Sequence, residues 1–555
     1  MTTPTVDFDL LTQPWIRAID QDGRPRTLSV REVFRHAHEL SRLTGEVPTQ
    51  SFAVLRLLLA ILHRSVTNRT GITAAIWGDL WRTQTTVSGE TRTTLPFEEI
   101  DRYLTDNADR FGLFDADKPF FQVAGLRSEN NTVSALDKLI ADVPNGEKYF
   151  TTRAGASVER IDFAEAARWL VHVHAFDPSG IKTGAVGDNR VKKGKGYPIG
   201  VAWTGCLGGV FLEGATLRET LLLNLVLRDV NAERFSSNDI PPWERDPDGA
   251  AGRANTAPTG PVDLCTWQSR RVRLVHDGTQ VTGVVLCNGD ALEPFNQQRI
   301  EPMTGWRFSE QQTKKAGGEA RHYPMTHEPE RALWRGLTSL IGEVANPTGT
   351  RGRAIAPGVL EWLSYLVDED ELDPAHPVRL HATGVHYINN QSVIGDIFDD
   401  TIGFRVALLS AEPELRTLAV NAVQVADNAV YALATLAGNL ATAVGGEPEG
   451  ALSRAKERGY FALDGPYRRW LAALKPAAAP DYDEYDARWA RLVRSVIEPI
   501  GADLIASAAL PGWVGREARG HYIDSSQAAR WFRRRLEQLL PAAYPRRTDE
   551  GGSAA

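Results

Sequence analysis

The chain has 555 residues, 42% of them hydrophobic and 24% charged, and this composition excludes a chain that is mainly disordered. Its formal net charge of −8 excludes a uniformly basic surface, so any contact with phosphate has to come from a local cluster of basic residues. Cys206, Cys265 and Cys287 are too few for a disulfide framework or for an all-cysteine zinc site. At roughly 100–200 residues per domain, the length predicts two to four domains.

No early segment has the length of a membrane span. The most apolar one, Ala53 to Leu62, contains Arg56 and is shorter than the ~18 residues that a span needs. Met1 to Leu10 contains two Asp and no Lys or Arg, a pattern that does not fit a signal peptide. We therefore expect the protein in the cytoplasm and without a membrane partner, and the low cysteine count agrees with a reducing compartment.

The first part of the chain alternates short helical and strand-like segments, without the regular rhythm of a Rossmann or barrel fold. Ser51 is the predicted N-cap of the first strong helix, and Asp277-Gly278 is the predicted turn of a hairpin. The pattern predicts an irregular α+β domain over residues 1–400. The elements expected most strongly are helices over 52–62, 163–174 and 217–226 and strands over 272–275 and 282–286.

Beyond residue 400 the pattern is helical. Apolar residues recur at steps of three and four, Pro499 is expected to kink one helix, and Asp524 begins a capping box. Trp531 is expected on the apolar face of the last helix. Four helices with short connections predict a four-helix bundle over residues 401–545, followed by a flexible tail over 546–555. The predicted helices cover 411–443, 451–475, 489–504 and 524–540.

The sequence contains no catalytic motif that stands out. It has no HExxH, no GxSxG and no phosphate-binding GxxxxGK[ST]. His172 and His174 are two residues apart on a predicted helix and therefore do not share a face. His276-Asp277 resembles the His-Asp pair of metal phosphohydrolases, but it precedes Gly278, which favours a turn.

Basic residues gather most densely between Gly180 and Gly196, where Asp188 is the only acidic residue. Five glycines in the same segment let backbone N–H groups approach an anion closely. Such a loop suits a nucleic-acid backbone, while a solvated loop without a ligand explains the composition equally well. The basic residues are Lys182, Arg190, Lys192, Lys193 and Lys195.

Two further basic clusters are less specific. Arg270, Arg271 and Arg273 follow Trp267 on a predicted strand, where phosphate contact or stacking competes evenly with a plain solvent-facing strand. The cluster on the last helix is more typical of a solvated face, with a protein partner or RNA as the alternative. It consists of Arg530, Arg533, Arg534 and Arg535.

A polar turn is predicted at Asn389-Asn390-Gln391-Ser392, between two β-branched arms. Such a hairpin tip projects Gln391 outward, where an amide can read base edges or fill the gap left by a displaced base. From these residues alone, an ordinary turn is the favoured interpretation.

Several segments, taken together and in order, resemble the CasA family, the large subunit of the type I-E CRISPR surveillance complex, Cascade. The resemblance extends from the N-terminus to the final helix and is completed by the helical C-terminus. The segments are Phe8-Asp9-Leu10-Leu11 with Pro14-Trp15-Ile16, Lys118-Pro119-Phe120-Phe121-Gln122, Leu136-Asp137-Lys138-Leu139-Ile140, Leu222-Leu223-Asn224-Leu225, Thr266-Trp267-Gln268 and Tyr387 to Ile394.

The resemblance implies a subunit without enzymatic activity. Its partners would be the other Cascade subunits, the 5′ end of the guide RNA, and double-stranded target DNA carrying the short flanking motif called the PAM. It would start strand opening and help recruit a separate helicase-nuclease. The lack of a catalytic motif and the local basic loops agree with this.

Carried over by position, the resemblance assigns roles to individual residues. The RNA-contacting aromatic of the family corresponds to Phe150. The glycine loop that faces the PAM duplex corresponds to Ser179 and Gly180, and the glutamine wedge corresponds to Gln391 with Asn390 beside it.

At two places this sequence departs from the pattern of the family. A lysine that probes the minor groove in some members falls near residues 297–299, where Arg299 is the candidate. Some members carry a cysteine cluster after the position of Val275, whereas this chain has Cys287 alone there, which argues against a zinc site. Two other functions stay open: a purely structural scaffold subunit, and a metal-dependent phosphohydrolase that uses His276-Asp277.

Overall fold

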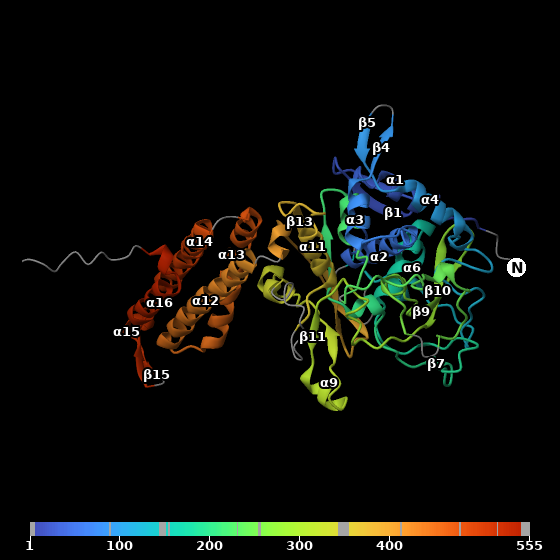
Figure 1. Cartoon of the computed structure of the whole chain (residues 1–555). Coiled ribbons are helices and arrows are strands. Elements are labelled where there is room, and N and C mark those ends of the chain that lie inside the picture. Colours follow the sequence, from blue (N-terminus) through green and yellow to red (C-terminus); the bar gives the residue numbers. More distant parts are fainter. Residues whose placement is uncertain are drawn as a thin grey trace, which may run out of the picture. The chain divides into compact units, whose positions relative to one another are not determined.

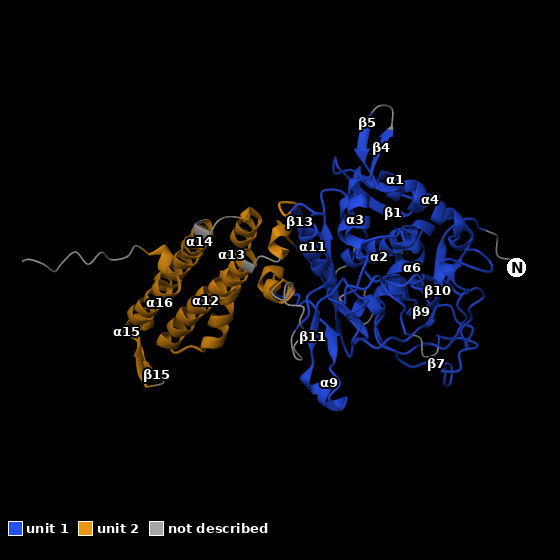
Figure 2. Ribbon diagram, viewed as in Figure 1, with its two compact units in different colours: residues 1–331, 343–373, 377–401 blue, residues 332–342, 374–376, 402–555 orange. Residues whose placement is uncertain are grey.

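The computed structural model describes residues 6–87, 90–143, 151, 153, 156–229, 231–253, 257–341, 354–410, 413–476, 479–518 and 520–544. The chain divides into two compact units (Figure 1; Figure 2). Unit 1 comprises residues 1–331, 343–373 and 377–401, and unit 2 comprises residues 332–342, 374–376 and 402–555. The α+β class expected from the sequence is confirmed, because unit 1 mixes helices with small sheets and the C-terminus is helical.

The predicted domain ranges, 1–400 and 401–545, did not anticipate that two short segments from before residue 400 group with unit 2. These segments are residues 332–342 and 374–376. The predicted flexible tail, 546–555, lies outside the described residues.

Unit 1 is built from helices and short strands that alternate along the chain (Figure 1). In chain order they are β1 (Ile16–Asp20), β2 (Pro25–Leu28), α1 (Val30–His36), β3 (Leu40–Leu43), α2 (Pro48–Ser65), α3 (Thr73–Arg82), β4 (Gln84–Val87), β5 (Glu90–Thr93), α4 (Phe97–Asp106), α5 (Ala156–Glu159), α6 (Phe163–Phe176), β6 (Lys182–Thr183), β7 (Lys195–Gly196), β8 (Gly209–Glu213), α7 (Leu217–Leu223), α8 (Pro261–Cys265), β9 (Arg270–His276), β10 (Val281–Asn288), β11 (Trp306–Phe308), α9 (Glu310–Lys315), β12 (His322–Pro324), α11 (Gly358–Asp368), β13 (Pro377–Ile388) and β14 (Val393–Arg405), the last residues of which belong to unit 2. Short 3-10 helices lie between some of them.

The sheets of the described chain are small. Two have three strands, in the orders β2-β1-β3 and β14-β13-β8, and the others are two-stranded. In the second sheet β8 pairs antiparallel with β13, from Arg379 opposite Glu213 to Thr383 opposite Gly209. This pairing fixes the base of the long β13–β14 hairpin against the core of unit 1.

Helix α2 forms the centre of that core. It is buried over most of its length because α4, α6 and α8 pack against it. Its one buried charge, Arg56, donates to both carboxylate oxygens of Glu301 at 2.9 and 2.7 Å, and both side chains are almost fully buried. A bidentate pair of this kind satisfies a charge that would otherwise be costly in a core.

The strongest local predictions are confirmed. Helix α6 begins as predicted, because Asp162 caps it by accepting from the backbone N–H of Glu165 at 2.7 Å. The predicted hairpin is β9 and β10, with Asp277 in its turn. The predicted N-cap Ser51 is wrong: α2 begins earlier, with Pro48 in its first turn, where the missing N–H and fixed φ of proline suit a helix start.

Unit 2 contains the long helices. Helix α12 contacts α13, α14 and α16, and aromatic ring contacts join Tyr467 of α13 to Trp489 of α14 and to Trp334. Tyr467 donates to the carbonyl of Ala419 at 3.0 Å, and Trp489 donates to the carbonyl of Ala422 at 2.9 Å, so two helices are tied to α12. The elements are α10 (Leu337–Ile341), α12 (Pro413–Val444), α13 (Pro448–Ala473), α14 (Ala479–Ala506), α15 (Leu510–Val514), β15 (Arg516–Ala518), β16 (His521–Ile523) and α16 (Ser525–Leu539).

The last helix follows its predicted start and, with the exception of Trp531, most of its predicted apolar face. Asp524 caps α16 by accepting from the backbone N–H of Gln527 at 2.7 Å. Trp531 is 39% exposed, although it was expected on the apolar face, because Phe532 and Leu536 take the buried positions. The arginines of α16 are exposed. Among the described helices, none is both long enough and apolar enough to cross a bilayer.

Candidate nucleic-acid interface

The loop that follows α6 is the first part of the candidate interface. Helix α6 ends at Phe176, and Pro178 cannot continue it because proline lacks a backbone N–H. Gly180 has φ of 135°, a conformation that residues with a side chain rarely adopt. The backbone N–H of Ser179 donates to the carbonyl of Gln391 at 2.8 Å. The loop is therefore bonded to the turn predicted at 389–392, which is distant in sequence.

That turn, between β13 and β14, is the second part. Asn389, Asn390 and Gln391 have φ of 51°, 57° and 65°, so three successive residues are left-handed. Asn tolerates this region well, while Gln pays a larger steric cost. Ser392 closes the turn, its N–H donating to Ile388 at 3.1 Å and its hydroxyl to Asn389 at 2.7 Å. Asn389, Asn390 and Gln391 are all exposed.

A second contact attaches the hairpin to the end of α6. The hydroxyl of Tyr387 donates to the carbonyl of Phe176 at 2.7 Å. Gly205 lies so close that a Cβ there would be 2.3 Å from the Tyr387 hydroxyl oxygen, so only glycine leaves room for this ring position. The segment from Phe176 to Ser179 and the β13–β14 hairpin are thus joined at two points.

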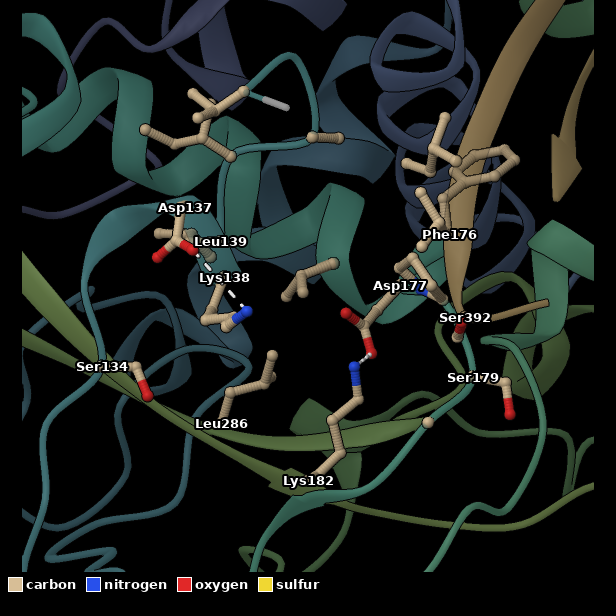
Figure 3. A pocket seen from close by; sticks show the side chains of 18 of the residues that line it. Ser134, Asp137, Lys138, Leu139, Phe176, Asp177, Ser179, Lys182, Leu286 and Ser392 are labelled. Atoms are coloured by element: carbon tan, nitrogen blue, oxygen red, sulfur yellow. Dashed lines mark ion pairs between the residues drawn. The ribbon is translucent and has the colours of Figure 1, made fainter. Parts of the chain in front are cut away.

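A cavity of about 360 Å³ lies beside these loops (Figure 3). Its lining combines apolar side chains, such as Phe176 and Leu286, with the hydroxyls of Ser179 and Ser392. Lys182 points toward Asp177 in Figure 3, and their ion pair is 2.6 Å long. The cavity therefore contains a charged pair that is already matched.

The charged groups beside the cavity are buried and form ion pairs with one another. Asp177 is 6% exposed and forms ion pairs with both Lys182 and the guanidinium of Arg270. Burial raises the pKa of Asp177, but the two cations outweigh it and hold that pKa below its ordinary value. Burial lowers the pKa of Lys182, and Asp177 opposes this shift only in part. The ammonium group of Lys182, which was predicted to contact phosphate, is therefore already paired with Asp177.

The other lysines of the basic loop are placed differently. Lys192 and Lys195 exchange backbone hydrogen bonds of 3.0 and 3.1 Å, which fold the segment between β6 and β7 into a tight turn. Lys193 lies in this turn with φ of 53°. All three side chains are exposed, and within the described part of the chain none of them forms an ion pair. Their charges are free to meet an external anion.

Two predicted arginines are held by carboxylates. Arg190 bonds both oxygens of Asp188, at 2.9 to 3.2 Å, and also donates to the carbonyl of Gly289 at 3.0 Å. Arg299, the candidate for the minor-groove probe, is 56% exposed but pairs with Asp229 and Glu233. A phosphate or base would have to compete with these acidic partners.

The cluster at Arg270 and Arg271 is neither a solvent-facing strand nor an open phosphate contact. Both side chains are 1% exposed, which corrects both interpretations considered from the sequence. Arg271 pairs with Asp290 at 2.7 Å, and Arg270 pairs with Asp177. They are buried because each finds a carboxylate from another segment, which the charge pattern of β9 alone does not reveal.

Two further expectations from the sequence concern Phe150 and a zinc site at Cys287. Phe150, the expected RNA-contacting aromatic, lies outside the described residues. Cys287 is buried, and burial raises the pKa of its thiol to about 12. Within the described residues, no group of three or more His, Cys, Asp or Glu side chains is arranged to hold a metal ion.

The His276-Asp277 pair forms a turn, as its glycine neighbour favoured. Asp277 accepts from the backbone N–H groups of Thr279 and Gln280 at 2.9 and 3.0 Å, and these bonds help to lower its pKa to about 2. Its other oxygen pairs with Arg160 at 3.1 Å. The ring of His276 packs against an aromatic neighbour at 4.5 Å. The carboxylate is therefore used by the hairpin itself.

Sequence reasoning missed Asp177 and the role of Arg270 at this site. Asp177-Pro178 directly precedes the glycine loop, and that pair signals the end of a helix. It does not reveal that the carboxylate collects two cations, one of them 93 residues away in the sequence. Only the packing of α6 against β9 brings these groups together.

Comparison with known proteins identifies one family. The family model described as CRISPR-associated protein Cse1 matches residues 9–498 of this chain. A curated relative from Thermus thermophilus, described as CRISPR-associated protein CasA/Cse1, is 27% identical, and the match covers 96% of this chain and 98% of the relative.

Solved structures agree with that match. The chain is similar to the crystal structure of Cse1 from Thermobifida fusca, with 44% identity, a TM-score of 0.88, and coverage of 98% of this chain and 100% of the other. It also shares its fold with a chain of a structure described as a CRISPR RNA-guided surveillance complex, at 19% identity and a TM-score of 0.62, covering 90% of this chain and 100% of the other.

Proposed function

Because this chain belongs to the CRISPR-associated Cse1 (CasA) family, we propose that it is the non-catalytic, nucleic-acid-binding subunit of a CRISPR RNA-guided surveillance complex. In that complex it contacts the 5′ end of the guide RNA, recognises the PAM in double-stranded target DNA and begins the opening of the strands. It assembles with the other Cascade subunits and helps to recruit the helicase-nuclease that cuts the DNA.

The observation that carries this proposal is the hydrogen bond between Ser179 and Gln391. It joins the glycine loop to the exposed hairpin turn, so that a duplex held by one meets the other at the same time. The free charges of Lys192, Lys193 and Lys195 lie in the chain segment that directly follows this loop. Backbone contacts of this kind position a duplex without reading its sequence.

Within this function Gln391 acts as the wedge. Unstacking the first base pair costs a few kcal/mol, and a side chain that fills the vacated stack offsets part of that cost. An amide stays uncharged beside phosphates and bonds to base edges. The left-handed turn and the bonds of Ser392 fix the direction in which Gln391 approaches the DNA.

The contacts of Asp277 give no support to a phosphohydrolase, because that carboxylate is engaged by its own turn and by Arg160. The scaffold alternative predicts that this subunit adds no dependence on the PAM. It is separated from the proposal by comparing binding to duplexes with and without a PAM.

The test is the Gln391→Ala variant in the assembled complex. We expect it to leave assembly with RNA and initial duplex binding largely intact, and to slow R-loop formation on intact PAM-bearing duplex. A duplex with mismatched strands beside the PAM should restore the rate, because the opening step has been done in advance.

The matched control is Gln311→Ala, which removes an amide from α9 of the same unit. It should form R-loops at the parental rate. An R-loop rate for Gln391→Ala equal to the parent, or no rescue by the mismatched duplex, contradicts the wedge. Binding that is equal for duplexes with and without a PAM supports the scaffold function instead.

A further inference from the structure

The guanidinium of Arg270 is almost fully buried, yet it donates to backbone carbonyls of two separate loop segments. It donates to Asp177 and Pro178 at 3.1 Å each and to Gly200 at 3.0 Å. Its Nε donates to the carboxylate of Asp177 as well. One side chain thus binds the segment just before the glycine loop and a second segment that follows the basic loop.

These contacts act directly on the candidate interface. The carbonyls of Asp177 and Pro178 immediately precede Ser179, whose N–H holds the carbonyl of Gln391. A fixed position for residues 177 and 178 therefore fixes the donor that meets the hairpin turn. The chain of contacts runs from Arg270 through the glycine loop to Gln391, without a gap.

Charge alone does not explain why an arginine occupies this place. Lys182 already supplies a positive charge to Asp177, at 2.6 Å. What Arg270 adds is a planar fork whose donors reach several acceptors at once, which an ammonium group cannot do from the same position. The geometry matches a clamp on the backbone more than a neutralising charge.

We propose that Arg270 is a positioning residue for strand opening: it holds the glycine loop in the conformation that orients the Gln391 turn toward DNA. The inference rests on the function proposed above, and it adds a residue that does not itself touch nucleic acid. The loss of its fork should loosen the glycine loop and the hairpin turn together, even before DNA is bound.

The first experiment measures this loosening in the free protein. Arg270→Lys keeps the charge and removes most of the carbonyl contacts. Hydrogen exchange of the segments 177–182 and 388–393 should become at least about tenfold faster, since a lost hydrogen bond to a charged group corresponds to roughly a factor of ten or more in an equilibrium constant.

The neighbouring residue provides a matched control. Arg271 is equally buried, but it binds Asp290, the carbonyl of Gly249 and the carbonyl of Gln268, which belong to other segments. Arg271→Lys should cost stability in a similar way and leave exchange in 177–182 and 388–393 as in the parent. Equal exchange in both segments for Arg270→Lys and the parent would overturn the proposal.

The second experiment measures R-loop formation by the assembled complex. Arg270→Lys should slow opening of intact duplex, be rescued by strands mismatched beside the PAM, and add little to the defect of Gln391→Ala in the double variant. Fully additive defects, or a parental rate for Arg270→Lys while Gln391→Ala is slow, would overturn the link to the wedge. A parental rate for Gln391→Ala itself would instead refute the proposed function, and the exchange data would still decide whether Arg270 holds the loop.

If Arg270→Lys does not fold, Asp177→Asn tests the same clamp from the other side. It keeps the size of the side chain and both loop carbonyls while it removes the carboxylate that orients the guanidinium. Faster exchange in 388–393 for this variant supports the proposal, and parental exchange in that segment contradicts it.

Discussion

Replacing Lys192, Lys193 and Lys195 together by Ala should weaken binding of the assembled complex to every duplex and reduce the salt dependence of that binding. These are the lysines of the basic loop whose charges the structure leaves exposed and without an ion pair among the described residues. Lys182 and Arg190 do not enter the count because Asp177 and Asp188 hold them.

The magnitude follows from this count. Each neutralised phosphate contributes about −0.9 to the slope of log K against log salt, so three contacts contribute roughly −2.7. Raising the salt fourfold, from about 50 to about 200 mM, should therefore weaken the parent about 40-fold more than it weakens the triple variant.

The assay is equilibrium binding to a PAM-bearing duplex and to an unrelated duplex across a salt series. The control replaces Lys118, Lys314 and Lys315 by Ala, which changes the net charge of the chain by the same amount at other positions of the same unit. It should keep most of the parental slope. Parallel slopes for the parent and the loop variant would refute the reasoning, because lysines that touch phosphate cannot be removed without a change in counterion release.

Two other predictions concern assembly and pH. Phe150→Ala should loosen the subunit from the guide RNA and the other subunits, since stacking of a base on an aromatic ring is worth roughly 1–3 kcal/mol, and unchanged co-purification at dilute concentration would contradict this. The side chain of His381 is mostly buried, and this burial lowers its pKa. The carboxylates of Asp399 and Glu213 outweigh burial and raise that pKa to about 9. Its contribution to stability is thus complete below pH ~6.5 and lost as the pH rises toward 9, by no more than about 3 kcal/mol and less because Asp399 is exposed. Denaturant unfolding at pH 6.5 and 9 should show this loss in the parent and a smaller one in His381→Gln, and equal losses in both would exclude the ion pairs as the cause.

Local signals in the sequence were sufficient where the cause of the structure is local. The cap at Asp524 and the turn at Asp277 depend on side chains that bond their own neighbours, so their prediction needs no knowledge of the fold. The start of α2 was misplaced because Ser51 and Pro48 are both good signals for a helix start, and the structure uses the proline.

Long-range pairing set the limit of sequence reasoning. The sequence around Arg270 and Arg271 has the charge pattern of an exposed basic strand. Their burial is favourable only because the fold pairs them with Asp177 and Asp290. The exposed turn at Gln391 was found because its Asn residues signal left-handed geometry. Its bond to Ser179 was not predictable, because a backbone contact leaves no trace in residue type.

In the left-handed turn at 389–392, folding stability and DNA opening favour different residues at position 391. Gln391 sits at φ of 65°, where glycine would avoid a steric cost on the order of 1 kcal/mol. A library of variants sorted only for thermal resistance would therefore drift toward Gly or Asn at 391, whereas sorting for DNA opening would favour the amide side chain. The residue found there after each kind of sorting becomes a readout of which demand dominates, and it makes position 391 a natural point for trading robustness against speed in an engineered complex.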